Sequence, residues 1–216
     1  TFSEDPLEEW PCLTKVTPTG QELWRVATPG YWNYYQTINA LADGTFLIGA
    51  WRFNHGMDET VIKRVDSAGV TLWTRYIGGS TSYSGGSGHS VVMADGNYLI
   101  PGAWMPPDSA SVDEHGYIAL YCFTPQGQQL WRHDLYYGRM ATATLVRRRE
   151  DGSMVVPSGY LQVPRDPDSA ATLWYLDAEG DTLFRRKYWY FGGYGALNVA
   201  TYGMDITSDG GAIFTG

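Results

Sequence analysis

The sequence predicts an all-β fold, and three observations support this prediction. The 216 residues include 26 Gly, 16 Tyr and 9 Trp, but only 18% are charged. Aromatic residues suit half-buried strands, and glycine punctuates turns. No segment has the pattern of a long amphipathic helix. Two short turn-containing phrases also recur along the chain, which is typical of a repeat architecture.

The first phrase is a turn glycine followed three residues later by leucine and an aromatic residue. It occurs at Gly20, Gly69, Gly127 and Gly180, and ends in Leu23-Trp24, Leu72-Trp73, Leu130-Trp131 and Leu183-Phe184. Successive copies lie about 50 residues apart. Each copy predicts a hairpin that turns at the glycine. We expect the leucine and the aromatic residue to close the gap between neighbouring repeats.

The second phrase is Asp-Gly between two apolar runs. It occurs at Asp43-Gly44, Asp95-Gly96, Asp151-Gly152 and Asp209-Gly210. Asp-Gly is a strong hairpin signal, because the turn needs a positive φ that glycine adopts at little cost. The two kinds of hairpin alternate, so two consecutive hairpins form a four-stranded antiparallel meander. A meander of about 50 residues has the size of one β-propeller blade.

The sequence therefore predicts a β-propeller of four-stranded antiparallel blades, with about four blades covered. Residues 1–12 are a lead-in segment and residues 13–216 the propeller, with a half-blade at 13–28, blades at about 35–76, 87–135 and 141–187, and a half-blade at 197–216. In a closed ring the two half-blades would form a fourth blade. In an open array the two half-blades belong to a larger propeller. We expect the open array rather than the closed ring. A solenoid of antiparallel hairpins is the competing architecture.

The connections between hairpins are longer than the turns within them. All long connections of a meander emerge on one face, so the face that carries the turns should be flat. Long loops on a rigid scaffold commonly carry function. Aromatic side chains crowd these loops and suit sugar stacking and protein interfaces, although they could instead pack the loops onto the blades. The predicted binding residues are Trp32, Tyr34, Trp51, Trp104, Tyr137, Trp189 and Tyr190.

Charge excludes several partner classes. The formal net charge of −8 and the pI near 4.9 disfavour nucleic acid and anionic membranes, which both need a basic surface. No apolar run approaches the roughly 18 residues of a membrane-spanning helix. We therefore expect no nucleic-acid partner and no membrane insertion.

Metal ligation has weak support in the sequence. Acidic residues recur in comparable loops and could bind Ca²⁺ through oxygen ligands, but they match no calcium-loop signature: Asp58, Glu59, Asp108, Asp113, Glu114, Asp166 and Asp168. The four histidines have no metal-ligand spacing: His55, His89, His115 and His133. We expect no cofactor, with Ca²⁺ as the open alternative.

The remaining polar features have plain interpretations. Cys12 and Cys122 lack the spacing of a zinc or redox motif, so we expect two separate, half-buried thiols. The basic run Arg147-Arg148-Arg149 precedes an Asp-Gly turn. We expect this run to be a solvated hairpin end paired with Glu150 or Asp151.

Three segments carry a resemblance to a known family. Residues Thr207–Ile213, Val61–Trp73 and Ile77-Gly78-Gly79 resemble the repeats of secreted Bacteroidota propellers. Members of that family are typically exported by the type IX secretion machinery through a C-terminal sorting domain, which is not found in this sequence. The resemblance implies an extracellular or outer cell-surface location, and it is specific for the scaffold rather than for an activity.

Together these features favour a non-enzymatic extracellular β-propeller that binds a protein or glycan, either as a type IX cargo or as part of an adhesin. The enzyme alternative is a quinoprotein, because Tyr117–Leu120 and Gly127–Trp131 are similar to the tryptophan-docking repeats of those enzymes. Quinoproteins bind Ca²⁺ and often carry adjacent cysteines, which do not occur in this sequence. A purely structural spacer is the third hypothesis.

Overall fold

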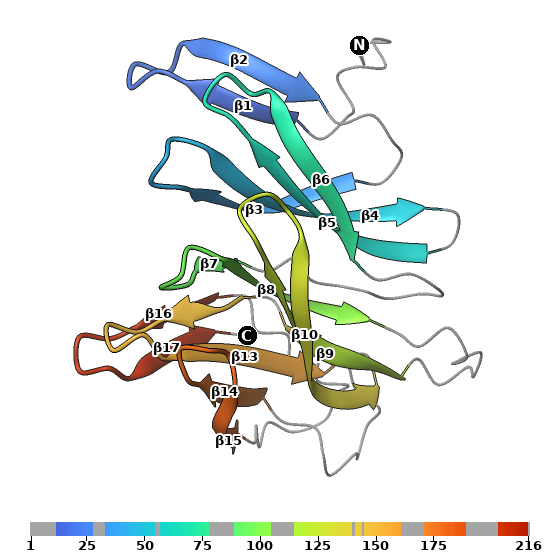
Figure 1. Cartoon of the computed structure of the whole chain (residues 1–216), viewed down its shortest axis with the longest axis vertical. Helices are drawn as coiled ribbons and strands as arrows, with labels where there is room; N and C mark the ends of the chain where they lie inside the picture. Colours follow the sequence, from blue (N-terminus) through green and yellow to red (C-terminus); the bar gives the residue numbers. More distant parts are fainter. Residues whose placement is uncertain are drawn as a thin grey trace.

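The computed structural model of the chain is a series of antiparallel β-sheets (Figure 1). The structure describes residues 12–27, 33–54, 57–77, 89–104, 115–139, 141–143, 145–160, 171–188 and 203–215. All regular secondary structure within these ranges is β-strand, so the predicted all-β fold class is confirmed. None of the described ranges contains a helix that is long and apolar enough to cross a membrane.

Two sheets have the predicted four-stranded order, and in a third sheet two short strands take the place of the first strand. The first consists of β3 (Asn33–Ala40), β4 (Phe46–Asn54), β5 (Met57–Val65) and β6 (Thr71–Ile77). The second consists of β7 (Val91–Val92), β8 (Tyr98–Trp104), β9 (His115–Phe123) and β10 (Gln129–Arg139). In the third, β11 (Ala141–Ala143) and β12 (Arg147–Arg148) both pair with β13 (Met154–Tyr160), and β14 (Ala171–Leu176) and β15 (Thr182–Tyr188) follow. We call these sheets blades 1, 2 and 3.

Two hairpins accompany the blades. One consists of β1 (Cys12–Val16) and β2 (Glu22–Ala27), and the other of β16 (Gly203–Ile206) and β17 (Ala212–Thr215). They are separate two-stranded sheets, and Figure 1 shows β1 and β2 at the top and β16 and β17 in the lower half. Across the described residues they therefore do not join into a common fourth blade.

The hairpin turns follow the two sequence phrases. All eight turn glycines have a positive φ, between 79° and 97°. At Gly44 the backbone N–H donates to the Leu41 carbonyl (3.0 Å), and the Leu41 N–H donates to the Thr45 carbonyl (2.9 Å). A three-residue loop of this kind requires a left-handed residue, which glycine supplies. The Asp43 carboxylate accepts the Thr45 N–H (3.1 Å) and holds the turn in shape.

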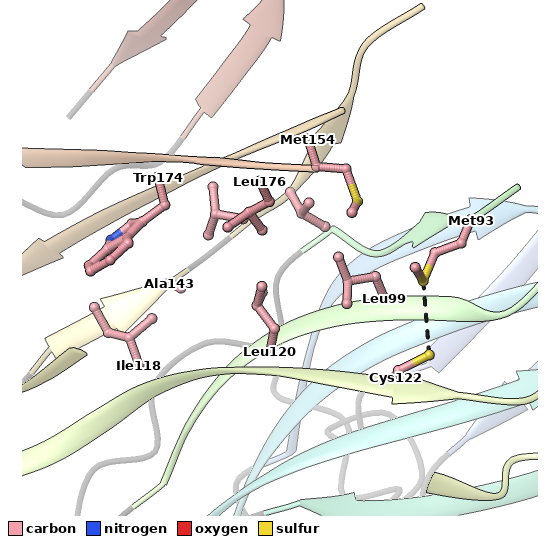
Figure 2. Close-up of a cluster of buried hydrophobic side chains, with 11 residues drawn as sticks. Met93, Leu99, Ile118, Leu120, Cys122, Ala143, Met154, Trp174 and Leu176 are labelled. Atoms are coloured by element: carbon pink, nitrogen blue, oxygen red, sulfur yellow. Dashed lines mark hydrogen bonds between the residues drawn. The ribbon is translucent and has the colours of Figure 1, made fainter. Parts of the chain in front are cut away.

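Apolar side chains fill the space between successive blades. Residues of blades 2 and 3 form the largest buried cluster, which includes Leu99, Leu120, Met154 and Trp174; Figure 2 shows these side chains between the two sheets. Similar clusters join blade 1 to blade 2 and blade 3 to the β16–β17 hairpin. The blades therefore stack face to face, as in a β-propeller.

First strands of neighbouring sheets also touch. His89, two residues before β7, forms a parallel bridge with Leu145, and its carbonyl accepts the Val146 N–H (3.0 Å). The Asn39 side-chain amide of blade 1 donates to the Ser90 hydroxyl (2.7 Å). First strands are thus the point where sheets converge, which is the arrangement near a propeller axis.

A second joint lies at the outer strands, where an indole ring meets a glycine. A Cβ placed on Gly127 would lie 2.7 Å from the Trp73 ring, and the Trp73 indole N–H donates to the Pro125 carbonyl (2.9 Å). Only a residue without a side chain permits this approach. The same contact recurs between successive hairpins of the first sequence phrase. The ring of one hairpin lies on the turn glycine of the next: Trp24 on Gly69, Trp73 on Gly127, and Trp131 on Gly180.

The predicted role of the leucine in the Leu-Trp pair is wrong. The four leucines are between 48% and 58% exposed: Leu23, Leu72, Leu130 and Leu183. Successive side chains of a strand point to opposite faces, so a tryptophan that packs on the next blade turns its leucine away from that blade. The tryptophan alone closes the gap.

We expect Gly127→Ala to destabilise the protein more than Gly44→Ala, although both glycines have a φ of 79°. Each substitution costs about 1–2 kcal/mol for the left-handed backbone. At Gly127 the new methyl group also meets the Trp73 ring, which adds about 1–3 kcal/mol, whereas a Cβ on Gly44 meets nothing within 4 Å. Urea unfolding of the two variants measures the difference, and equal losses would contradict the joint.

Candidate functional site: the strand ends opposite the turns

The predicted binding residues divide into two groups. Tyr34, Trp51, Trp104 and Tyr137 lie in strands whose backbone the structure describes. The other three lie outside the described residues: Trp32, Trp189 and Tyr190. The placement of the first group can therefore be compared with the prediction, and the second group stays a prediction.

In blade 1 the strand register brings two of these residues together. Tyr34 near the start of β3 is the register partner of Trp51 near the end of β4. Trp51 in turn is opposite Thr60 of β5. Strands β4 and β8 run from the turns on the left of Figure 1 toward the right, so this pair lies at the end of the sheet away from the Asp43-Gly44 turn.

Blade 2 has a longer row at the same end. Trp104, the last residue of β8, is opposite Tyr117 of β9, and Tyr117 is opposite Tyr137 of β10. Three aromatic residues thus occupy one row across three adjacent strands. Tyr117 is absent from the predicted set, because only the β8–β9–β10 register shows that it lies between the other two.

A register irregularity lies next to each aromatic group. The β3–β4 register shifts between Tyr35 and Thr37, one pair after Tyr34 and Trp51. The β10–β9 register shifts between Asp134 and Tyr136, directly before Tyr137. Bulges of this kind bend a strand and redirect its side chains, and they are common beside binding sites.

Buried hydroxyl groups lie close to this end of blades 1 and 3. Thr60 is fully buried, and its Oγ1 has no hydrogen-bond partner in the described part of the chain. In blade 3 the Ser158 hydroxyl accepts the Trp174 indole N–H (3.0 Å) and donates to the Thr172 carbonyl (3.3 Å). These two hydrogen bonds tie β13 to β14 within blade 3.

The histidines and acidic residues do not form a metal centre in the described ranges, where no group of three or more metal-binding side chains occurs. His133 stacks on Trp131 with ring centroids 4.3 Å apart, so it belongs to the joint between blades 2 and 3. Burial and the nearby Arg147 lower the pKa of His89. Five of the seven carboxylates that could bind Ca²⁺ lie outside the described residues, so the Ca²⁺ alternative stays open: Asp108, Asp113, Glu114, Asp166 and Asp168.

The arginine run bridges sheets in addition to the predicted pairing at the turn, where hydrogen bonds from Ser153 and the charge of Arg149 lower the pKa of Asp151. The Arg149 guanidinium donates to the Gly210 carbonyl and lies 5.2 Å from the centroid of the Tyr175 ring. Arg148 donates to the Val92 carbonyl of blade 2 (3.4 Å). A hollow of about 580 Å³ lies between the two Asp-Gly turns that Arg149 connects, so the turn end is not uniformly flat.

The two cysteines are separate, as predicted, but neither is half-buried. Cys12 is exposed and Cys122 is buried, with its Sγ 3.9 Å from the Met93 sulfur (Figure 2). Burial raises the pKa of the Cys122 thiol to about 11.

Comparisons with known proteins identify no family for the chain. No family model matches it, and no curated protein does. Among solved structures it is similar to the crystal structure of puromycin hydrolase, with 14% identity and a TM-score of 0.44. The match covers 80% of this chain and 30% of that chain, so this chain spans less than a third of that protein. The resemblance to secreted repeat propellers stays a prediction.

We expect one thiol of the native protein to react quickly with a thiol reagent at about pH 8, because only the thiolate attacks and burial keeps Cys122 protonated. Unfolding should release the second thiol. The stability gained from a neutral Cys122 is full below its ordinary pKa of 9.0 and is lost as the pH rises toward about 11. Cys122→Ala should remove that part of the alkaline destabilisation. Rapid reaction of both thiols in the native state would contradict this account.

Proposed function

We propose that the protein is a non-enzymatic binding module, and that it engages a protein or glycan through the aromatic strand ends of blades 1 and 2. The observation that carries this proposal is the register, which aligns Trp104, Tyr117 and Tyr137 across three strands. The Tyr34–Trp51 pair of the neighbouring blade extends the same aromatic end.

The chemistry of these residues supports a flat, partly apolar ligand surface. Tyrosine and tryptophan offer a large rigid area with a polar edge, which suits both sugar rings and protein hot spots. Tyrosine and tryptophan side chains have few rotatable bonds, so binding would cost little side-chain entropy. The net charge of −8 favours a neutral or basic ligand over an anionic one.

The location of the protein belongs to the same proposal. The repeat phrases resemble those of secreted propellers, and this supports an extracellular or outer cell-surface setting with export by type IX machinery. A binding module at the cell surface would meet glycans and proteins of other cells or of the surrounding matrix.

We expect Trp51→Ala and Trp104→Ala each to weaken ligand binding at least about tenfold, since removing a central aromatic contact costs at least about 1–2 kcal/mol. Glycan-array binding and a cell-surface pull-down with the purified chain identify the ligand, and titration of the variants measures the loss. The matched control is Leu72→Ala, because Leu72 is a large exposed residue at the other end of blade 1.

The outcomes separate the hypotheses. Equal binding by the two tryptophan variants and the control would contradict the aromatic site, and the absence of any ligand would favour the structural-spacer hypothesis. A stoichiometric spectral shift on titration with pyrroloquinoline quinone and Ca²⁺ would instead favour the quinoprotein alternative.

A further inference from the structure

The outer edge of blade 1 differs in its residues from the outer edges of blades 2 and 3. We propose that two copies of the chain associate through this edge, so that β6 of one copy pairs antiparallel with β6 of the other about a two-fold axis at Thr74. This interaction goes beyond the proposed function, because it needs no ligand at the aromatic strand ends.

Each of the three blades ends in a strand that has a neighbour on one side. Within the described residues β6 pairs only with β5, β10 only with β9, and β15 only with β14. The other side of each outer strand presents backbone N–H and C=O groups with which a further strand could pair. Proteins commonly guard such edges with bulges and charged side chains, which prevent pairing with other chains.

The outer strands of blades 2 and 3 carry guards of this kind. In the middle of β10, Arg132 and Asp134 form an ion pair (2.9 Å), and the register shifts between Asp134 and Tyr136. In β15 three consecutive residues are basic: Arg185, Arg186 and Lys187. Two copies of β15 side by side would bring these like charges together. Neither edge therefore suits pairing with a second copy of itself.

The outer strand of blade 1 lacks these guards over its second half. From Trp73 to Ile77 its register with β5 is continuous, and the one register shift lies beside the turn. Arg75 is the one charged residue of β6, and its guanidinium donates to the Gly127 carbonyl of blade 2 and to the Thr74 carbonyl. A carbonyl oxygen has two lone pairs, so the Thr74 carbonyl can still accept a hydrogen bond from another strand.

The side chains of β6 complement a second copy of the same strand. Leu72 is 49% exposed and Tyr76 is 53% exposed. An antiparallel pairing about Thr74 places Leu72 opposite Tyr76 of the other copy, twice by symmetry. It also places Thr74 opposite Thr74, and Arg75 opposite Trp73. Cross-strand pairs of an aromatic with an apolar residue, and of two threonines, stabilise a sheet, and an arginine is attracted to the face of an indole ring.

Two neighbouring registers fit less well. A two-fold axis at Arg75 would set two like charges directly opposite each other, which is destabilising. An axis at Trp73 would replace the two Leu72–Tyr76 pairs by Leu72–Thr74 pairs. The axis at Thr74 therefore pairs the exposed apolar residues without opposing like charges. A two-fold contact closes on itself, so the product is a dimer in which two four-stranded blades form one continuous sheet.

Thr74 meets its own symmetry mate in this dimer, so a charge at this position provides the test. We expect the purified wild-type chain to dimerise in sedimentation experiments over a broad range of concentration. Thr74→Lys and Thr74→Glu should each weaken dimerisation at least about fivefold, because each sets two like charges opposite each other. The matched controls are Thr182→Lys and Thr182→Glu, since Thr182 is a threonine of the outer strand β15.

Mixing the two Thr74 variants makes the test specific for two-fold pairing. Opposite charges meet in the mixture, so a Thr74→Lys chain should pair with a Thr74→Glu chain at least as tightly as two wild-type chains pair. This recovery also shows that both variants are folded. Dimerisation that ignores the Thr74 substitutions, or a loss that mixing fails to restore, would overturn the proposal. A monomeric wild-type chain would also overturn it and would favour an extended segment of another protein at this edge.

A cysteine at the axis gives a second readout. In a Cys12→Ser background, Thr74→Cys should form a symmetric disulfide dimer under mild oxidation, because directly opposite residues of paired strands have the Cα separation that a disulfide needs. The remaining native thiol, Cys122, is buried. Thr182→Cys in the same background is the control and should stay monomeric. Equal cross-linking of the two variants would contradict the proposed pairing.

Discussion

The contact between an indole ring and a turn glycine is the constraint on which the arrangement of the blades depends. Trp73 and Trp131 reach across to the next blade and lie where a Cβ on Gly127 or Gly180 would stand. The glycine is therefore needed twice, once for its positive φ and once for its missing side chain. Because the same pair recurs at three successive junctions, one short phrase sets both the turn and the spacing of neighbouring sheets.

This double role explains how far the sequence predicts the fold. The turn glycines, the four-stranded meanders and the role of the tryptophans follow from local patterns with a fixed period. The role of the leucines does not, because alternation along a strand shows only that Leu72 and Trp73 face opposite ways, and not which face is covered. The arginine contacts were also missed, since the Gly210 carbonyl that Arg149 reaches is distant in sequence. Tyr117 joins the candidate site for a similar reason, because its neighbours are set by strand register.

The two ends of the strands differ in their residues. At the turn end, glycines, Asp side chains and the arginines of blade 3 are engaged in turns and in bridges between sheets. At the opposite end the strand register aligns Trp104, Tyr117 and Tyr137.

A double-mutant cycle on Trp73 and Gly127 tests the central claim most directly. The free energy of unfolding is measured for the wild type, Trp73→Ala, Gly127→Ala and the double variant. If the ring and the glycine form one joint, the methyl group of Gly127→Ala should cost about 1–3 kcal/mol less once the ring is gone. Additive losses would contradict the claim, because they would show that the two residues stabilise the protein independently.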